Sequence, residues 1–230
     1  MSNDITYSEL ELIKSNIKEF NDKLKDVSKS LNHELTQVEL DFYIFISKHI
    51  ILFKYLYNRM DDQYFFKVLI SDLYYFILSI LKGETRYVYV NERSIIENYA
   101  RAITRRTVEE DHVTEKLFLK MKDILFSYGF TEEDYCLIKN EYKTSCGYIH
   151  GGNILNDSLA YVLDECLENN ILIDDINKYY TRIRKILKIC DKVLIFEYGE
   201  YISNCFHRKK TIFEYLLGKE CLELLFSITN

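Results

Sequence analysis

Proline is absent from all 230 residues of the chain, and this absence constrains the fold more than any other feature of the sequence. A proline inside a helix removes one backbone hydrogen bond and clashes with the preceding turn, so a chain without proline can form long, unbroken helices. Apolar residues also recur at spacings of three and four, the pattern of an amphipathic helix. In the first such segment they are Leu10, Ile13, Ile17, Phe20, Leu24, Val27 and Leu31.

Capping residues and glycines divide the chain into segments of helical pattern. We expect seven to nine helices in one antiparallel all-α bundle with little or no sheet. The bundle forms a single domain over residues 1–230, with 1–35 and 205–230 as extensions. One segment departs from the pattern: Arg86–Val90 alternates and contains β-branched residues, which predicts a short extended piece before the cap Asn91. The helices are expected over residues 5–31, 36–60, 63–82, 92–106, 115–128, 131–150, 159–168, 175–190 resuming over 191–204, and 211–227.

Charge and cysteine usage narrow the functional classes. A formal charge of −6 argues against a surface that coats nucleic acid, but it leaves room for a small basic cleft. The six cysteines form no Cys-x-x-Cys pair and have no zinc spacing, so we expect reduced, buried thiols, no metal site and no cofactor. The apolar runs 42–57 and 65–81 are interrupted by polar residues. They are therefore expected to be core helices of a cytoplasmic protein with no membrane partner.

The stretch from Thr131 to Asn153 has the greatest chemical potential. It begins with a capping threonine and three acidic residues and reaches two glycines directly after His150. Lys143 and His150 are seven residues apart and therefore share one helical face. One interpretation is a basic group and an imidazole facing a ligand that the glycines allow to approach. The other is a histidine that binds the free carbonyls at a helix end, and the residues alone leave both open.

Other charged groups have two interpretations as well. Arg93, Glu97, Arg101 and Arg105 line one face of a predicted helix, where solvated ion pairs are the simpler explanation. His207 precedes three basic residues, which indicates either a charged surface turn or an anion-binding spot. The remaining histidines have no apparent partner in the sequence: His33, His49 and His112.

Two segments carry a family resemblance. Residues 71–98 read SDLYYFILSILKGETRYVYVNERSIIEN, with an Arg-Ser-x-x-Glu core at Arg93–Glu97, and residues 141–152 read EYKTSCGYIHGG. Over about residues 40–200 the chain resembles the HEPN superfamily, all-α domains of bacterial antiphage, toxin–antitoxin and abortive-infection systems. The second segment is similar to the region of that family's Arg-x(4–6)-His ribonuclease motif. Here Lys143 stands where the family has arginine, at six intervening residues before His150.

The resemblance implies a metal-independent endoribonuclease that leaves a 2′,3′-cyclic phosphate. His150 is then the general base or acid, and Lys143 and Arg93 stabilise the pentavalent phosphate. Glu97 orients Arg93 or His150. The residues expected to contact RNA are Tyr148, Asn153 and Arg101.

The sequence also leads to a prediction of the oligomeric state and to an alternative function. Seven residues of helix separate Lys143 from His150 by about 10 Å, so one helix cannot close both on one phosphate. We therefore expect a homodimer that builds a composite cleft around a twofold axis. The alternative is a non-catalytic HEPN-like module that binds a partner protein or a ligand of a defence or antitoxin system, which the acidic charge and the missing arginine favour.

Overall fold

The computed structural model describes residues 2–59, 64–106, 115–150 and 175–229 and positions 160 and 173, with residues 2–6 as backbone only. Within these ranges all regular secondary structure is helical, which confirms the all-α prediction. The elements are α1 (Ser2–Ser30), α2 (Gln37–Tyr57), α3 (Tyr64–Leu81), α4 (Thr85–Ile103), α5 (Glu115–Ser127), α6 (Glu132–Ile149), α8 (Ile176–Cys205), α9 (Lys210–Leu217) and α10 (Lys219–Thr229).

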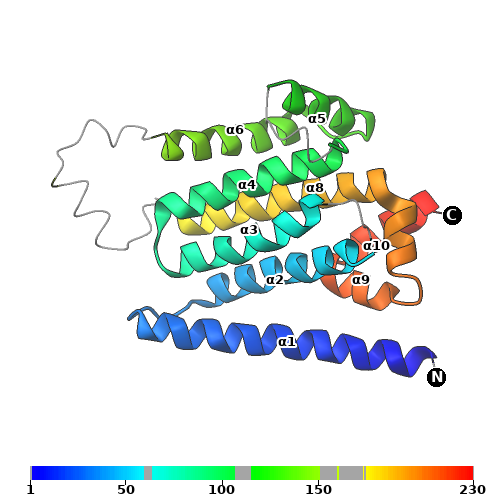
Figure 1. Ribbon diagram of the computed structural model, residues 1–230, viewed down its shortest axis with the longest axis horizontal. Coiled ribbons are helices and arrows are strands. Elements are labelled where there is room, and N and C mark those ends of the chain that lie inside the picture. The colour runs from blue at the N-terminus through cyan, green and yellow to red at the C-terminus, as the bar shows by residue number, and fades with distance from the viewer. Residues whose placement is uncertain are drawn as a thin grey trace.

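The helices lie side by side in a bundle (Figure 1). The consecutive helices α2, α3 and α4 pack against one another, and α8 contacts α2, α4 and α6. Helices α5 and α6 cover one side of this centre and α1 covers the other, while α9 and α10 pack near the C-terminal end of α8 (Figure 1). Helix α8 therefore joins the α6 side of the bundle to the α9 side.

Aromatic side chains fill much of the core. The chain has 20 tyrosines and 14 phenylalanines but no tryptophan. Phe42 stacks on Tyr180 with ring centroids 4.2 Å apart, and Phe53 meets Tyr99 edge to face at 5.4 Å. Offset-stacked and edge-to-face pairs are the favoured geometries, because they bring a positive ring edge to a negative ring face. These contacts tie α2 to α4 and α8.

The predicted helix boundaries hold where a cap or a glycine defines them. Thr36 and Thr131 each accept a hydrogen bond from the backbone of the third helical residue, whose carboxylate in turn accepts from the threonine backbone. Gly83 and Gly129 follow α3 and α5 with φ of 71° and 80°, the left-handed conformation that glycine adopts at low cost.

The extended segment predicted at Arg86–Val90 is wrong, because these residues form the first turns of α4. Buried Val88 and Tyr89 continue the spacing of the buried residues that follow in the same helix. Packing of that stripe outweighs the strand preference of the β-branched residues. Asn91 is consequently not a helix cap, and its side-chain amide donates to the Tyr87 carbonyl at 2.8 Å.

Two boundaries near the C-terminus also differ from the prediction. No break separates the segments 175–190 and 191–204: α8 continues through both and kinks only at Tyr198. The predicted final helix over 211–227 is two helices, α9 and α10, divided at Gly218, whose φ is 91°. The predicted loop 107–114 and the predicted helix 159–168 lie outside the described residues, apart from position 160.

Helix α3 is the one described helix that is long and apolar enough to cross a membrane, and half of it is buried inside the bundle. A core helix has the same composition, and Leu69, Leu73 and Phe76 of α3 are fully buried. Five cysteines lie in the described part of the chain as free thiols, and three of these are buried.

Candidate functional site

Four of the predicted site residues lie where α4 packs on α6, namely Arg93, Glu97, Tyr148 and His150. Arg86 at the start of α4 lies against Ile149 at the end of α6, and Glu97, about three turns later, contacts Tyr142. The two helices therefore run antiparallel. We call this contact region the α4–α6 seam, from Arg86 and His150 at one end to Glu97 and Tyr142 at the other.

His150 ends α6. Its backbone N–H donates to the Cys146 carbonyl at 3.0 Å, and its side chain is exposed. The guanidinium of Arg86 is also exposed, and Nη2 lies 3.4 Å from the carbonyl oxygen of Ile149, the residue before His150. The fold thus places an arginine beside the histidine. The sequence does not indicate Arg86 as a site residue, because the contact joins residues 63 positions apart and the segment has the pattern of a strand.

Lys143 lies about two turns before His150 on α6, on the side that faces α5. Lys139 binds Glu115 of α5 directly and, with Lys143 at longer range, lowers the pKa of Glu115. Lys143 is exposed, and the seven helical residues up to His150 correspond to about 10 Å. Within one chain the structure does not bring Lys143 and His150 together.

Arg93 and Glu97 form the other end of the seam. Arg93 Nε donates to Glu97 Oε1 at 2.8 Å, and the Tyr142 hydroxyl donates to the same oxygen at 2.9 Å. Burial, followed by the charge of Glu97, raises the pKa of Tyr142. Of the two partners expected for Glu97, the structure pairs it with Arg93. The Arg93 side chain remains 30% exposed.

The residues expected to contact RNA do not form one surface. Arg101 lies on α4 roughly 22 Å from Arg86, donates to Asn98 Oδ1 at 2.9 Å and is only 17% exposed. Tyr148 is near His150, but one face of its ring stacks on Tyr89 with centroids 3.8 Å apart. The predicted contact Asn153 lies outside the described residues.

A polar network between α4, α6 and α8 lies in the interior behind the α4–α6 seam. Glu92 of α4 accepts a hydrogen bond from the Tyr179 hydroxyl of α8 at 2.5 Å and contacts the Ser145 hydroxyl of α6. Arg182 of α8 donates to Glu141 of α6 through Nε at 3.0 Å and Nη2 at 3.2 Å. The network therefore joins the three helices at one level of the bundle.

Burial and hydrogen bonding act in opposite directions on the protonation of Glu92. Burial, reinforced by the charge of Glu141, raises the pKa of Glu92 to about 8. The Ser145 hydroxyl also lies 3.0 Å from the Glu141 backbone carbonyl, which can only accept. The Ser145 and Tyr179 hydroxyls both donate to Glu92, and these hydrogen bonds lower the pKa of Glu92 in opposition to burial. Burial is the larger effect, and it favours a neutral Glu92 at pH 7.

The histidines thought to lack partners have them in two cases, so that prediction is wrong. Buried His49 has Nδ1 2.8 Å from the Phe45 carbonyl and Nε2 2.8 Å from Asp191, which also accepts from Tyr99. Both ring nitrogens face acceptors, which defines a doubly protonated imidazole paired with an ionised carboxylate. Burial lowers the pKa of His49, but Asp191 outweighs it and the pKa is raised.

His33 lies 3.0 Å from Glu39 at the start of α2, and His112 lies outside the described residues. In the basic turn after His207, Lys209 pairs with Glu9 at 2.8 Å and Lys210 binds Ser203. These contacts favour the charged surface turn over an anion-binding spot.

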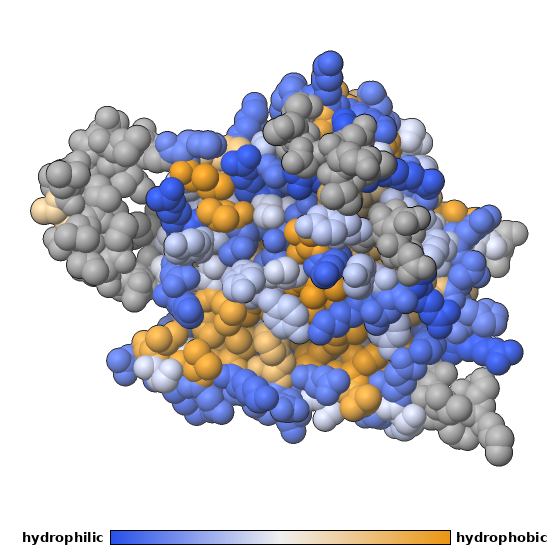
Figure 2. Space-filling model, viewed as in Figure 1, coloured by the Kyte–Doolittle hydropathy of each residue, from blue (hydrophilic) through white to orange (hydrophobic). Residues whose placement is uncertain are grey.

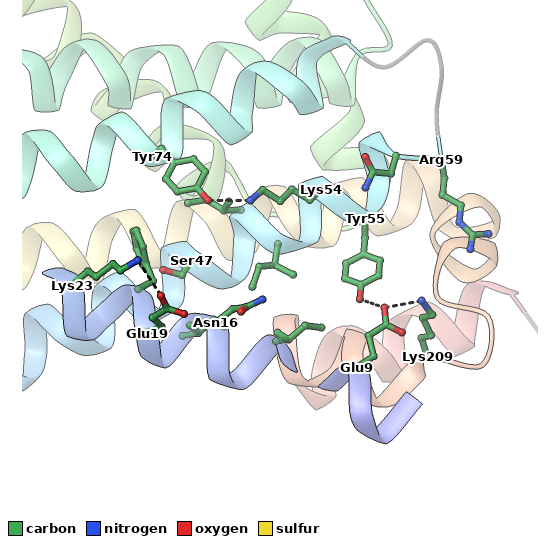
Figure 3. Close-up of a pocket in the computed structure, with 16 residues that line it drawn as sticks. Glu9, Asn16, Glu19, Lys23, Ser47, Lys54, Tyr55, Arg59, Tyr74 and Lys209 are labelled. Carbon is green, nitrogen blue, oxygen red and sulfur yellow. Dashed lines mark hydrogen bonds and ion pairs between the residues drawn. The ribbon is translucent and has the colours of Figure 1, made fainter. Parts of the chain in front are cut away.

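A cavity of about 680 Å³ lies away from the seam, between α1 and α2. Apolar surface is exposed along this groove (Figure 2), and several of its charged groups bind partners within it (Figure 3). Glu9 accepts hydrogen bonds from Tyr55 and Lys209. Lys23 forms an ion pair with Glu19, and Lys54 donates a hydrogen bond to the Tyr74 hydroxyl. In the described part of the chain, no three His, Cys, Asp or Glu side chains gather to hold a metal ion.

Comparisons with protein-family models, with curated proteins and with solved structures find no match to this chain. The geometry of the site is therefore the basis for the function proposed below.

Proposed function

We propose that the chain is a HEPN-like endoribonuclease of a prokaryotic antiphage, toxin–antitoxin or stress system, and that it cleaves RNA at the Arg86–His150 end of the α4–α6 seam. One observation carries the proposal: Arg86 and His150 are both exposed, and the Arg86 guanidinium lies 3.4 Å from the carbonyl directly before His150. Arginine binds phosphate oxygens through two parallel hydrogen bonds, and histidine transfers protons near neutral pH.

The reaction follows from these two groups. Neutral His150 removes the proton from the ribose 2′-hydroxyl, and the resulting oxygen attacks the adjacent phosphorus. Arg86 stabilises the charge of the pentavalent phosphate. The bond to the 5′-oxygen breaks, and a protonated His150 from the second subunit of the proposed homodimer donates to that oxygen. The products are a 2′,3′-cyclic phosphate and a 5′-hydroxyl.

The remaining basic residues have supporting roles in this proposal. Lys143, about two turns from His150, is placed to neutralise a phosphate of a neighbouring nucleotide rather than the reacting one. Arg93, whose side chain is 30% exposed, adds a second positive charge for the same strand, and Glu97 and Tyr142 fix its orientation. This assigns Arg86 the role that the family motif gives to arginine.

A non-catalytic module that binds a partner protein or a ligand is the second candidate. The observation that favours it is that Arg93, Glu97 and Tyr142 bind one another instead of being directed at His150. In that case the α4–α6 seam is a packing contact that stabilises the fold, and the residues at its exposed end transfer no proton.

Cleavage of total RNA by the purified chain distinguishes the two candidates. We expect cleavage in the presence of chelator, with cyclic phosphate ends. His150→Ala should slow it by about 10²–10⁴-fold, the usual contribution of a positioned proton-transfer group. His207→Ala is the matched control, because His207 is another exposed histidine of the same chain. If the wild-type protein leaves RNA intact, or if His150→Ala cleaves as fast as His207→Ala, the non-catalytic module is the only one of the two candidates that remains.

A further inference from the structure

A second cavity, of about 560 Å³, lies between α2, α8 and α9. We call it the α2–α9 pocket. Its lining includes Lys48, Arg184 and Lys188, and buried His49 with Asp191 forms part of its wall. The pocket has no part in the proposed ribonuclease reaction, because α9 lies on the side of the bundle opposite α6 (Figure 1).

Two cations of this pocket are half-buried without a carboxylate partner. Lys48 Nζ lies 4.1 Å from the centre of the Tyr215 ring, and the Arg184 guanidinium lies 5.3 Å from the centre of the Phe45 ring. Among the described residues, neither cation is within ion-pair distance of an Asp or Glu. Burial lowers the pKa of both side chains, which means that local carboxylates do not compensate for their loss of water.

The acidic groups at the pocket do not cancel these charges. Asp191 is paired with His49. Asp41 accepts from the Gln37 amide at 2.8 Å and reaches Arg184 only at longer range. The remaining carboxylate of the lining is that of Glu214. Three lysine and arginine side chains therefore face two carboxylates outside the His49–Asp191 pair, which leaves the pocket positive.

The larger α1–α2 groove provides an internal comparison. Glu9 pairs with Lys209 and Glu19 with Lys23, Lys54 donates to a tyrosine hydroxyl, and the further cation of the lining, Arg59, is exposed (Figure 3). The α2–α9 pocket differs in that its two half-buried cations have no such carboxylate partner among the described residues. An anion entering the pocket would supply the missing counter-charge.

We propose that the α2–α9 pocket binds a small phosphate monoester with an apolar body. The phosphate would contact Lys48 and Arg184, since arginine matches phosphate through its planar fork and lysine adds a point charge. The body would pack on the aliphatic part of the lining, Ile44, Leu216 and Leu217. A volume of about 560 Å³ suits such a molecule, because small-molecule sites span about 300–1,000 Å³.

Phenyl phosphate is a direct probe of this proposal. We expect the full chain to bind it saturably at millimolar concentrations in calorimetry, more tightly than phenol, which lacks the anion, and inorganic phosphate, which lacks the body. Phenyl phosphate that does not bind, or that binds no better than phenol, would overturn the proposal. Benzoate that binds as tightly would overturn the assignment of phosphate as the preferred anion.

Variants locate the bound probe. Arg184→Gln and Lys48→Gln should each weaken phenyl phosphate binding by about tenfold or more, because a partly desolvated charge contact is lost. Lys54→Gln is the control, since Lys54 is a lysine of the same helix α2 that lines the other groove. Far-ultraviolet circular dichroism checks that each variant is folded. Affinity that is unchanged in both folded pocket variants, or reduced as much in Lys54→Gln, would contradict the location.

Discussion

At the scale of single residues, the protonation of Glu92 links the core to pH. Its pKa in the folded chain is about 8, above the ordinary value of 4.5, so the folded state holds a proton that the unfolded state releases. The stability that this proton contributes is complete below about pH 4.5 and is lost as the pH rises through about 8. The raised pKa of His49 acts in the same direction.

The prediction for Glu92 is a change in the pH dependence of unfolding. Thermal unfolding of the wild type should occur at progressively lower temperature as the pH rises from about 5 to 8. Glu92→Gln removes the titrating proton and keeps a neutral side chain of similar shape, so this variant should lose less stability over the same range. Circular dichroism melts across that pH series measure both. Parallel slopes for the two proteins would mean that Glu92 does not titrate as described.

At the scale of elements, local sequence signals predicted the helix boundaries at which a capping residue stands. Tertiary packing determined where α4 begins. Thr36 and Thr131 could be assigned as caps because their partners are three residues away in the sequence. The start of α4 could not, because its alternating residues satisfy a strand and a helix pattern equally until Val88 and Tyr89 are seen in the core. That ambiguity also concealed Arg86, the basic residue nearest the end of α6.

The helical start of α4 can be tested with Val90, which is 37% exposed. Alanine has a higher helix propensity than valine and a lower strand propensity. Val90→Ala should therefore raise the free energy of unfolding by about 0.5 kcal/mol if the residue is helical. Urea unfolding gives the value. A loss of stability of similar size would instead favour the extended segment that the sequence alone predicts.

At the scale of the molecule, the all-α class was predictable and the sites were less so. The absence of proline and the spacing of apolar residues required only local information. The α2–α9 pocket joins Lys48 to Arg184, and the buried pair joins His49 to Asp191, across most of the chain. Sequence spacing holds no information on which helices pack together, so these partners emerged only from the fold.

The proposed reaction predicts that the whole molecule is a homodimer. The proposed reaction needs a second proton donor, and Lys143 and His150 of one chain are about 10 Å apart along α6. We expect light scattering at tens of micromolar to give twice the mass of the chain, which is 27.6 kDa. A monomer at that concentration would remove the composite cleft and leave the second proton transfer without a donor.

A double-mutant cycle tests most directly whether Arg86 and His150 form one catalytic site. Cleavage rates of a defined RNA are measured for the wild type, Arg86→Ala, His150→Ala and the double variant. Groups that act on the same transition state are strongly non-additive. The double variant should therefore be no more than about tenfold slower than the slower single variant. A double variant whose loss equals the product of the two single losses would show that the residues act independently, and it would contradict the site proposed at this end of the α4–α6 seam.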